Sequence, residues 1–167
     1  RQMCIRDRYG AICISMIAFN CVCIFMFKRS NTRLDHRSRK LEQRVRIQLE
    51  RIANEEEVEK KHFCYLNRKL SHVGNLMAFD ETLKQIFQNN ENEAKQYLYE
   101  IRSVFLYLSV VYLKKESVQS AYFAYLLSKY KICSHMSFDA MLDILKEYLK
   151  KESLYCRQNA MKALYSF

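Results

Sequence analysis

The segment Tyr112-Leu-Lys-Lys-Glu-Ser117 recurs letter for letter as Tyr148-Leu-Lys-Lys-Glu-Ser153, 36 residues further along the chain. Six identical residues seldom recur by chance in a chain of 167 residues. A fixed period of this size is typical of helical hairpins that stack side by side and bury their apolar faces against one another. The sequence therefore predicts a helical repeat array, a class of structure that usually binds other proteins.

The turn-forming residues favour the same fold class. The chain has no proline and only two glycines, whereas sheet proteins need turn residues every few positions. We expect an all-α fold that consists of an N-terminal transmembrane helix, a basic helical stalk and an α-solenoid of helical hairpins. The expected boundaries are 9–27 for the transmembrane helix, 28–53 for the juxtamembrane stalk and 54–167 for the repeat domain.

Both ends of the chain read as incomplete. Residues 1–8, RQMCIRDR, resemble the translation of a DNA-sequencing adapter, and the alternative is a short basic tail. At the other end, Phe167 falls in what we interpret as the first helix of a further repeat, without its partner helix. We therefore expect a fragment truncated at its C-terminus, and we leave Arg1, Arg6 and Arg8 out of the charge arguments.

Residues 9–27, YGAICISMIAFNCVCIFMF, form a run without a single charge. As a helix this run would be about 28 Å long, close to the ~30 Å hydrocarbon core of a bilayer. A secretory signal would have a shorter apolar stretch and a small-residue cleavage site. A buried helix of a soluble protein would usually carry a polar stripe. The run therefore predicts a transmembrane helix.

A basic block follows the apolar run and predicts its orientation. Between Lys28 and Arg51 lie nine basic and three acidic residues, a net charge of +6. Basic flanks stay on the cytoplasmic side, so we expect a cell-membrane protein with a cytoplasmic C-terminal part. Residues 52–167 have a net charge of only +2, whereas a domain that binds nucleic acid usually has a strongly basic surface. The residues expected to contact lipid headgroups are Lys28, Arg29, Arg33, Arg37, Arg39 and Lys40.

The apolar spacing over 54–167 predicts a series of helices. We expect one helix to end near Leu70, the next to end at Asn89-Asn90, and a single long helix to cover 91–115. Small polar residues before apolar runs predict the helix starts. These expected N-caps are Asn54, Ser117, Ser137 and Ser153.

The last part of the chain resembles HEAT repeats, which are helix–turn–helix units of about this length. The first helix of such a unit commonly shows an arginine, two small residues and a leucine, and the fitting residues are Arg157, Ala160, Ala163 and Leu164. The preceding copy has Ala124 and Leu127 at the equivalent places, but Ala121 replaces the arginine. The family's usual proline is absent from both copies. The resemblance implies a curved solenoid whose second helices line a concave, protein-binding surface.

The second helix of the clearest unit carries the candidate binding face. Its polar residues are Asp139, Asp143, Lys146, Glu147 and Lys150. The alternative is that these residues form the ordinary solvated side of a surface helix.

Motifs that carry chemistry are missing from the sequence. There is no glycine-rich phosphate loop, no HExxH and no nucleophile elbow. The seven cysteines form no CxxC pair, and we expect them to act as small buried hydrophobes. His36 follows the apolar run as in sensor kinases, but Arg37 stands where those proteins carry an acid. We expect no enzyme activity, cofactor, metal, nucleic acid or small-molecule substrate.

Together these features predict a bacterial scaffold or adaptor protein. The apolar run would anchor it in the membrane, and the HEAT-like solenoid would bind another protein in the cytosol. The alternative is a regulatory or anchoring segment of a larger, truncated membrane enzyme or sensor.

Overall fold

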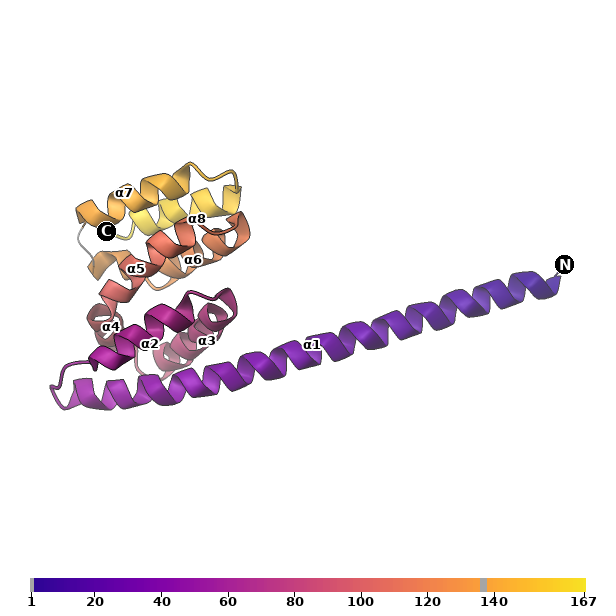
Figure 1. Cartoon of the computed structure of the whole chain (residues 1–167), viewed down its shortest axis with the longest axis horizontal. Coiled ribbons are helices and arrows are strands. Elements are labelled where there is room, and N and C mark those ends of the chain that lie inside the picture. Colours follow the sequence, from indigo (N-terminus) through magenta and orange to yellow (C-terminus); the bar gives the residue numbers. More distant parts are fainter. Residues whose placement is uncertain (1, 136–137) are drawn as a thin grey trace. The chain divides into compact units, whose positions relative to one another are not determined.

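The structure, a computed structural model, describes residues 2–135 and 138–167, apart from the side chains of 2–7, 135 and 138. Every element in this part of the chain is a helix (Figure 1), so the expected all-α class is confirmed. The expected cap Ser137 and the side chains of the adapter-like residues up to Asp7 lie outside the described residues. In chain order the elements are α1 (Gln2–Ala53), α2 (Lys60–Leu70), α3 (Val73–Asn89), α4 (Glu91–Glu100), α5 (Arg102–Leu113), α6 (Ser117–Lys129), the 3₁₀ helix η1 (Ile132–His135), α7 (Phe138–Leu149) and α8 (Leu154–Leu164).

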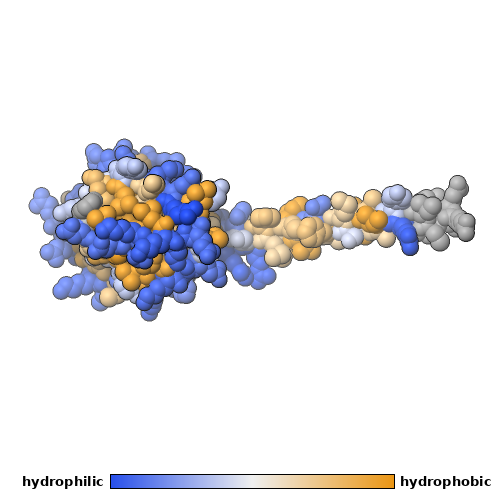
Figure 2. Space-filling model, turned by 90° about the horizontal axis from the view of Figure 1, so that it is seen from above, coloured by the Kyte–Doolittle hydropathy of each residue, from blue (hydrophilic) through white to orange (hydrophobic). Residues whose placement is uncertain are grey.

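The chain divides into two compact units, Arg1–His36 and Arg37–Phe167, which we call the N-terminal unit and the helical domain. Over residues 9–27 the apolar side chains of α1 are exposed apart from the half-buried Cys23, for example 69% of Phe19 and 72% of Phe27. Figure 2 shows these hydrophobic side chains along the helix. By length and composition, this is the one helix in the described part of the chain that is able to cross a membrane.

The helical domain begins inside α1, at Arg37. The side chains of Leu41, Val45 and Ile52 are buried in its core. Two polar side chains on the same face of α1, Ser38 and Gln48, are buried as well. Together these five positions form a continuous stripe at three- and four-residue spacing, which packs as the side of a core helix does.

This packing differs from the boundary expected from the sequence, which assigned residues 28–53 to a stalk. The apolar stripe looked too narrow for a domain helix because Ser38 and Gln48 interrupt it. In the structure the Ser38 and Thr82 hydroxyl oxygens lie 3.2 Å apart, within hydrogen-bond distance. The backbone N–H of Glu59 donates to the side-chain oxygen of Gln48 at 3.0 Å. Polar residues therefore complete the buried stripe, and the hydropathy pattern alone does not reveal them.

The remaining helices of the domain pack in two rows (Figure 1). α5 packs against both α2 and α7, and α6 packs against both α3 and α8. Short turns join α2 to α3, α5 to α6 and α7 to α8, and the members of each pair contact one another as a hairpin. The sequence suggested that the helices at 117–127 and 137–149 form one unit and that the helix at 154–164 begins the next. In the structure α6 forms its hairpin with α5, and α8 forms its hairpin with α7.

The two copies of the repeated segment occupy equivalent places, the turns of the α5–α6 and α7–α8 hairpins. Both tyrosine side chains are fully buried. The Tyr112 hydroxyl donates to the Leu70 carbonyl oxygen at 2.7 Å, and the Tyr148 hydroxyl donates to the Ser109 carbonyl oxygen at 2.8 Å. Each copy therefore links its own hairpin to a helix of the preceding one, α2 or α5.

The repeated lysines reach in the same direction. The Lys115 Nζ donates to the Ser71 carbonyl oxygen at 2.5 Å, and the Lys151 Nζ donates to the Lys115 carbonyl oxygen at 3.4 Å. Carbonyl groups at helix ends have no partner within their own helix. The lysines therefore satisfy carbonyl oxygens in the turn of the neighbouring hairpin, so the tyrosine and the second lysine of the repeated segment have equivalent roles in both copies.

Two of the predicted helix starts need correction. The segment after Asn54 is a turn and loop in which Glu55 has φ 60°, so α2 begins only at Lys60. Ser117 is the first residue of α6, and Glu116 is the cap residue, without a side-chain cap hydrogen bond. Ser153 is confirmed as an N-cap, because its hydroxyl oxygen accepts the Cys156 N–H at 3.4 Å.

The expected single helix at 91–115 is two helices. They separate at Ile101, whose backbone (φ −90°, ψ 14°) leaves the helical region while its side chain stays fully buried. The change of direction lets α4 pack against α3 and η1, while α5 joins the row of α2 and α7. Apolar residues run through the whole segment, so its periodicity contains no sign of this break. Tertiary packing outweighs the local pattern here.

We expect Tyr112→Phe and Tyr148→Phe each to lower the free energy of unfolding by about 1–2 kcal/mol, because each leaves a carbonyl oxygen without its buried donor. Urea unfolding of the detergent-solubilised chain, followed by near-UV circular dichroism, measures the change. Tyr107→Phe is the matched control, since Tyr107 is half exposed on α5. Equal losses in all three variants would contradict this role of the repeat.

Candidate functional site

The five polar residues predicted to form a binding face are all exposed; four lie on α7, and Lys150 lies in the turn directly after it. They largely neutralise one another: the Lys146 Nζ lies 3.0 Å from a carboxylate oxygen of Asp143, and the Lys150 Nζ lies 2.6 Å from one of Glu147. Exposed pairs of this kind stabilise a helix only slightly. The structure thus places the five residues on α7 and in the turn after it, and their binding role stays a prediction.

The six residues predicted to contact lipid headgroups are also exposed. Lys28, Arg29 and Arg33 belong to the N-terminal unit, and Arg37, Arg39 and Lys40 to the helical domain. Arg37 lies close over Gly74, where a Cβ atom would meet its guanidinium group. Gly74 therefore allows the Arg37 side chain to lie against the start of α3.

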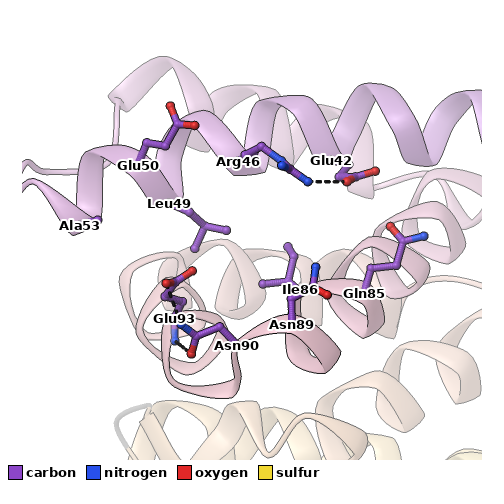
Figure 3. A pocket seen from close by; sticks show the side chains of 10 residues that line it. All are labelled: Glu42, Arg46, Leu49, Glu50, Ala53, Gln85, Ile86, Asn89, Asn90 and Glu93. Atoms are coloured by element: carbon purple, nitrogen blue, oxygen red, sulfur yellow. Dashed lines mark hydrogen bonds and ion pairs between the residues drawn. The ribbon is translucent and has the colours of Figure 1, made fainter.

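One cleft of the helical domain, about 290 Å³ in volume, lies between α1 and α3. Figure 3 shows Glu42 and Arg46 on α1 facing Asn89 and Gln85 on α3, with Ile86 between them. The guanidinium of Arg46 lies 3.1 Å from the Glu42 carboxylate. The cleft offers amides, one ion pair and the carboxylates of Glu50 and Glu93, and it contains no nucleophile beside a general base.

A second groove, about 770 Å³ in volume, lies between α1 and α2 and is strongly basic. Its floor contains the half-buried Tyr65 ring, and the guanidinium carbon of Arg44 lies 4.1 Å from the centre of that ring. Ile47 on α1 adds an apolar side chain that is 54% exposed. The cations that line the groove are Lys40, Arg44, Lys61, Arg68 and Lys69. We call this feature the basic groove.

The charge of the basic groove is not compensated within the described part of the chain. None of its five cations lies within ion-pair distance of a carboxylate there. The single acid in its lining, Glu59, instead lies 3.8 Å from the guanidinium of Arg51. By contrast, Lys84 and Lys95 on α3 and α4 pair with acids three or four residues away. The groove therefore attracts anions.

One wall of the groove contains a buried histidine, His62. Its Nε2 lies 2.8 Å from the hydroxyl of Tyr97, whose side chain is fully buried. Burial, and secondarily the positive charge of Arg44, lower the pKa of His62 to about 4. The imidazole is therefore neutral at pH 7 and takes part in core hydrogen bonding.

The cysteines and the potential metal ligands do not gather at one place in the described part of the chain. Cys133 and Cys156 are buried as expected, and burial raises the pKa of the Cys133 thiol to about 12 and also raises that of Cys156. Cys13 and Cys21 on α1 and Cys64 on α2 depart from the expectation, because they are exposed. In the described part of the chain, no group of three or more His, Cys, Asp or Glu residues is placed to hold a metal ion.

The α2 side of the basic groove was not predicted from the sequence. Lys61, Tyr65 and Arg68 follow one another at i, i+4 and i+7 and therefore share a helix face. On α1, Arg37, Lys40 and Arg44 lie at i, i+3 and i+7, a spacing that also places residues on one helix face. The signal was present in the sequence, but the acids just before α2 reduce the regional net charge and conceal it.

Comparisons with known proteins add no assignment to these surfaces. No protein-family model matches the chain, and neither curated proteins nor solved structures provide a significant match. The resemblance to HEAT repeats therefore depends on the residues of this chain alone.

The pKa of His62 leads to a prediction about acid stability. Between about pH 6.5 and 4 the unfolded chain binds a proton at His62 that the folded domain does not, so stability falls as the pH falls through this window. We expect His62→Gln to remove roughly 3 kcal/mol of this pH dependence. Urea unfolding at a series of pH values measures it, with the exposed His72→Gln as control. A parent-like pH dependence in His62→Gln would contradict the prediction.

Proposed function

We propose that this protein is a membrane-anchored scaffold that binds another protein through its helical domain. The observation that carries the proposal is the exposed apolar helix of the N-terminal unit, which is followed in the chain by a separate compact domain of hairpins. Exposed apolar side chains over the length of a bilayer core are unfavourable in water and favourable in lipid. A domain anchored in this way meets other membrane-associated proteins at a raised effective concentration, so weak contacts suffice.

A HEAT-like solenoid is the arrangement we propose for the hairpins. Its support is the contact of α5 with α2 and α7, and of α6 with α3 and α8. In such an array each hairpin buries a face against the next. The identical turn segments, which make equivalent hydrogen bonds to the preceding hairpin, also support a true repeat.

The residues that resemble the HEAT pattern lie on α6 and α8, which are the second helices of their hairpins and not the first as the resemblance implied. Ala160 and Ala163 on α8 are fully buried, and so is Ala124 on α6, whereas Arg157 is exposed. α6 and α8 pack against each other. Small residues at such a contact let two helices approach closely, as stacked units require.

Surface composition supports protein binding. Several large apolar side chains of the domain are exposed, and aromatic residues of this kind often serve as anchors in protein interfaces. On α6, on α8 and at the C-cap of α8 they are Val118, Tyr125, Leu154, Tyr155, Met161 and Tyr165.

The anchoring is tested by placing a charge in the apolar run. We expect Ile17→Arg to move the protein from the membrane fraction to the soluble or aggregated fraction, because an arginine at the centre of a span costs about 2.5–3.5 kcal/mol on insertion scales. Val118→Arg is the control, since Val118 is a 79% exposed apolar residue of the helical domain. Carbonate extraction of membranes and immunoblotting provide the measurement. Retention of Ile17→Arg in the membrane would count against the proposal.

The cytoplasmic orientation has its own test, because Cys64 is exposed in the helical domain while Cys133 and Cys156 are buried. We expect a membrane-impermeant maleimide to leave Cys64 unmodified in intact bacterial cells and to modify it after lysis. Mass spectrometry of the Cys64 peptide measures the modified fraction. Full modification in intact cells would place the helical domain outside the cytoplasm and refute this orientation.

A further inference from the structure

We propose that the basic groove between α1 and α2 binds an acidic helical segment of a protein partner. This inference depends on the proposed scaffold function and deepens it, because it gives both the docking place and the chemistry of the partner. It places the docking site on α1 and α2, away from the polar face of α7 that the sequence suggested.

The groove has two basic walls. α1 contributes Lys40 and Arg44, which are four residues apart on one helix face, and α2 contributes Lys61, Arg68 and Lys69. From Lys61 to Lys69, α2 rises about 12 Å, slightly more than two helical turns. Acidic residues at i, i+4 and i+7 of a docking helix extend over about the same length, so a helix of this pattern matches the charges of both walls.

The floor of the groove indicates that the partner also supplies an apolar side chain. The Tyr65 ring lies below the Arg44 guanidinium, and Ile47 beside it is about half exposed. Helical segments that dock into grooves commonly combine apolar anchors with charges at the rim. The occupant we infer is therefore an amphipathic helix with acidic residues beside a leucine or similar side chain.

The unpaired positive charge of the groove favours the binding of an acidic partner. Within the described part of the chain, the five cations have no carboxylate partner, and Glu59 is paired with Arg51 outside this set. Like charges gathered on two facing helices repel one another. An acidic partner removes this repulsion and gains charge-assisted hydrogen bonds from the arginines.

The shape and lining of the groove favour a polypeptide over the two other anionic partners. A bilayer presents its phosphates on a surface far wider than the groove, whereas these cations line two walls of a concavity that is open on one side. Proteins that bind single-stranded RNA offer aromatic rings for stacking, but the Arg44 guanidinium already lies over the Tyr65 ring. A helix that is charged along one edge and apolar at its centre uses both the walls and the floor.

The test measures peptide binding to the full chain in nanodiscs of uncharged phosphatidylcholine. The probe is a fluorescein-labelled helical peptide with glutamates at i, i+4 and i+7 and a leucine between them, and the readout is fluorescence anisotropy. We expect Lys61→Glu/Arg68→Glu to weaken binding by about tenfold, or ~1.4 kcal/mol. Lys40→Glu/Lys69→Glu, which changes one cation on each wall of the groove, should have a similar effect.

The matched control is Lys114→Glu/Lys162→Glu, which makes the same change of net charge at two exposed residues outside the groove. We expect this variant to bind as the parent does, with its helix content checked by circular dichroism. Equal weakening in the groove variants and in the control would overturn the proposal, because binding would then depend on net charge alone.

The same proteins are titrated with phosphatidylserine vesicles and with poly(U) RNA. If the groove variants lose either of these ligands but still bind the peptide, the groove is a membrane or nucleic-acid site and the proposal fails. Failure of the scaffold function itself would appear in the membrane-extraction experiment on Ile17→Arg, which does not involve the groove. The two failures are therefore distinguishable.

Discussion

The helical domain depends on one kind of contact, a buried tyrosine hydroxyl that bonds to a carbonyl oxygen of the preceding hairpin. The ring of Tyr112 stacks on Phe123 within its own hairpin, with ring centres 4.8 Å apart, while its hydroxyl reaches Leu70. Tyr148 makes the corresponding bond to Ser109. Apolar burial holds hairpins together but tolerates sliding, whereas a buried polar group must meet its partner. These two bonds therefore fix how each hairpin sits on the one before it.

Local features of the fold could be predicted from the sequence. The absence of proline indicated an all-helical chain, the Asn89-Asn90 pair marked the end of α3, and Ser153 was recognised as a cap. Each of these depends on a few neighbouring residues. The break at Ile101 could not be predicted in this way, because the energy that favours it comes from contacts of α4 and α5 with different helices. The start of the domain at Arg37 was hidden because Ser38 and Gln48 are polar yet buried.

The basic groove shows that the net charge of a stretch of sequence does not reveal which charged residues lie together in the fold. Lys40 and Arg44 belong to the basic block after the apolar run, whereas Lys61 and Arg68 lie in a region of low net charge. A net charge summed over each region of the sequence separates these residues, although α1 and α2 bring them to one groove. The polar residues of α7 show the opposite case. They are close in sequence and look like a binding face, but four of the five pair with one another.

The sequence separation of the residues that the tyrosine hydrogen bonds join affects how the domain folds. Tyr112 and Leu70 are 42 residues apart, and Tyr148 and Ser109 are 39 residues apart, so each bond reaches back to a helix of the preceding hairpin. Contacts of modest sequence separation form quickly, because little chain entropy is lost on closing them. The ribosome releases a chain from its N-terminus, and an early hairpin finds its partner as soon as the next one emerges. We therefore expect the domain to fold in the order of its synthesis, one hairpin at a time.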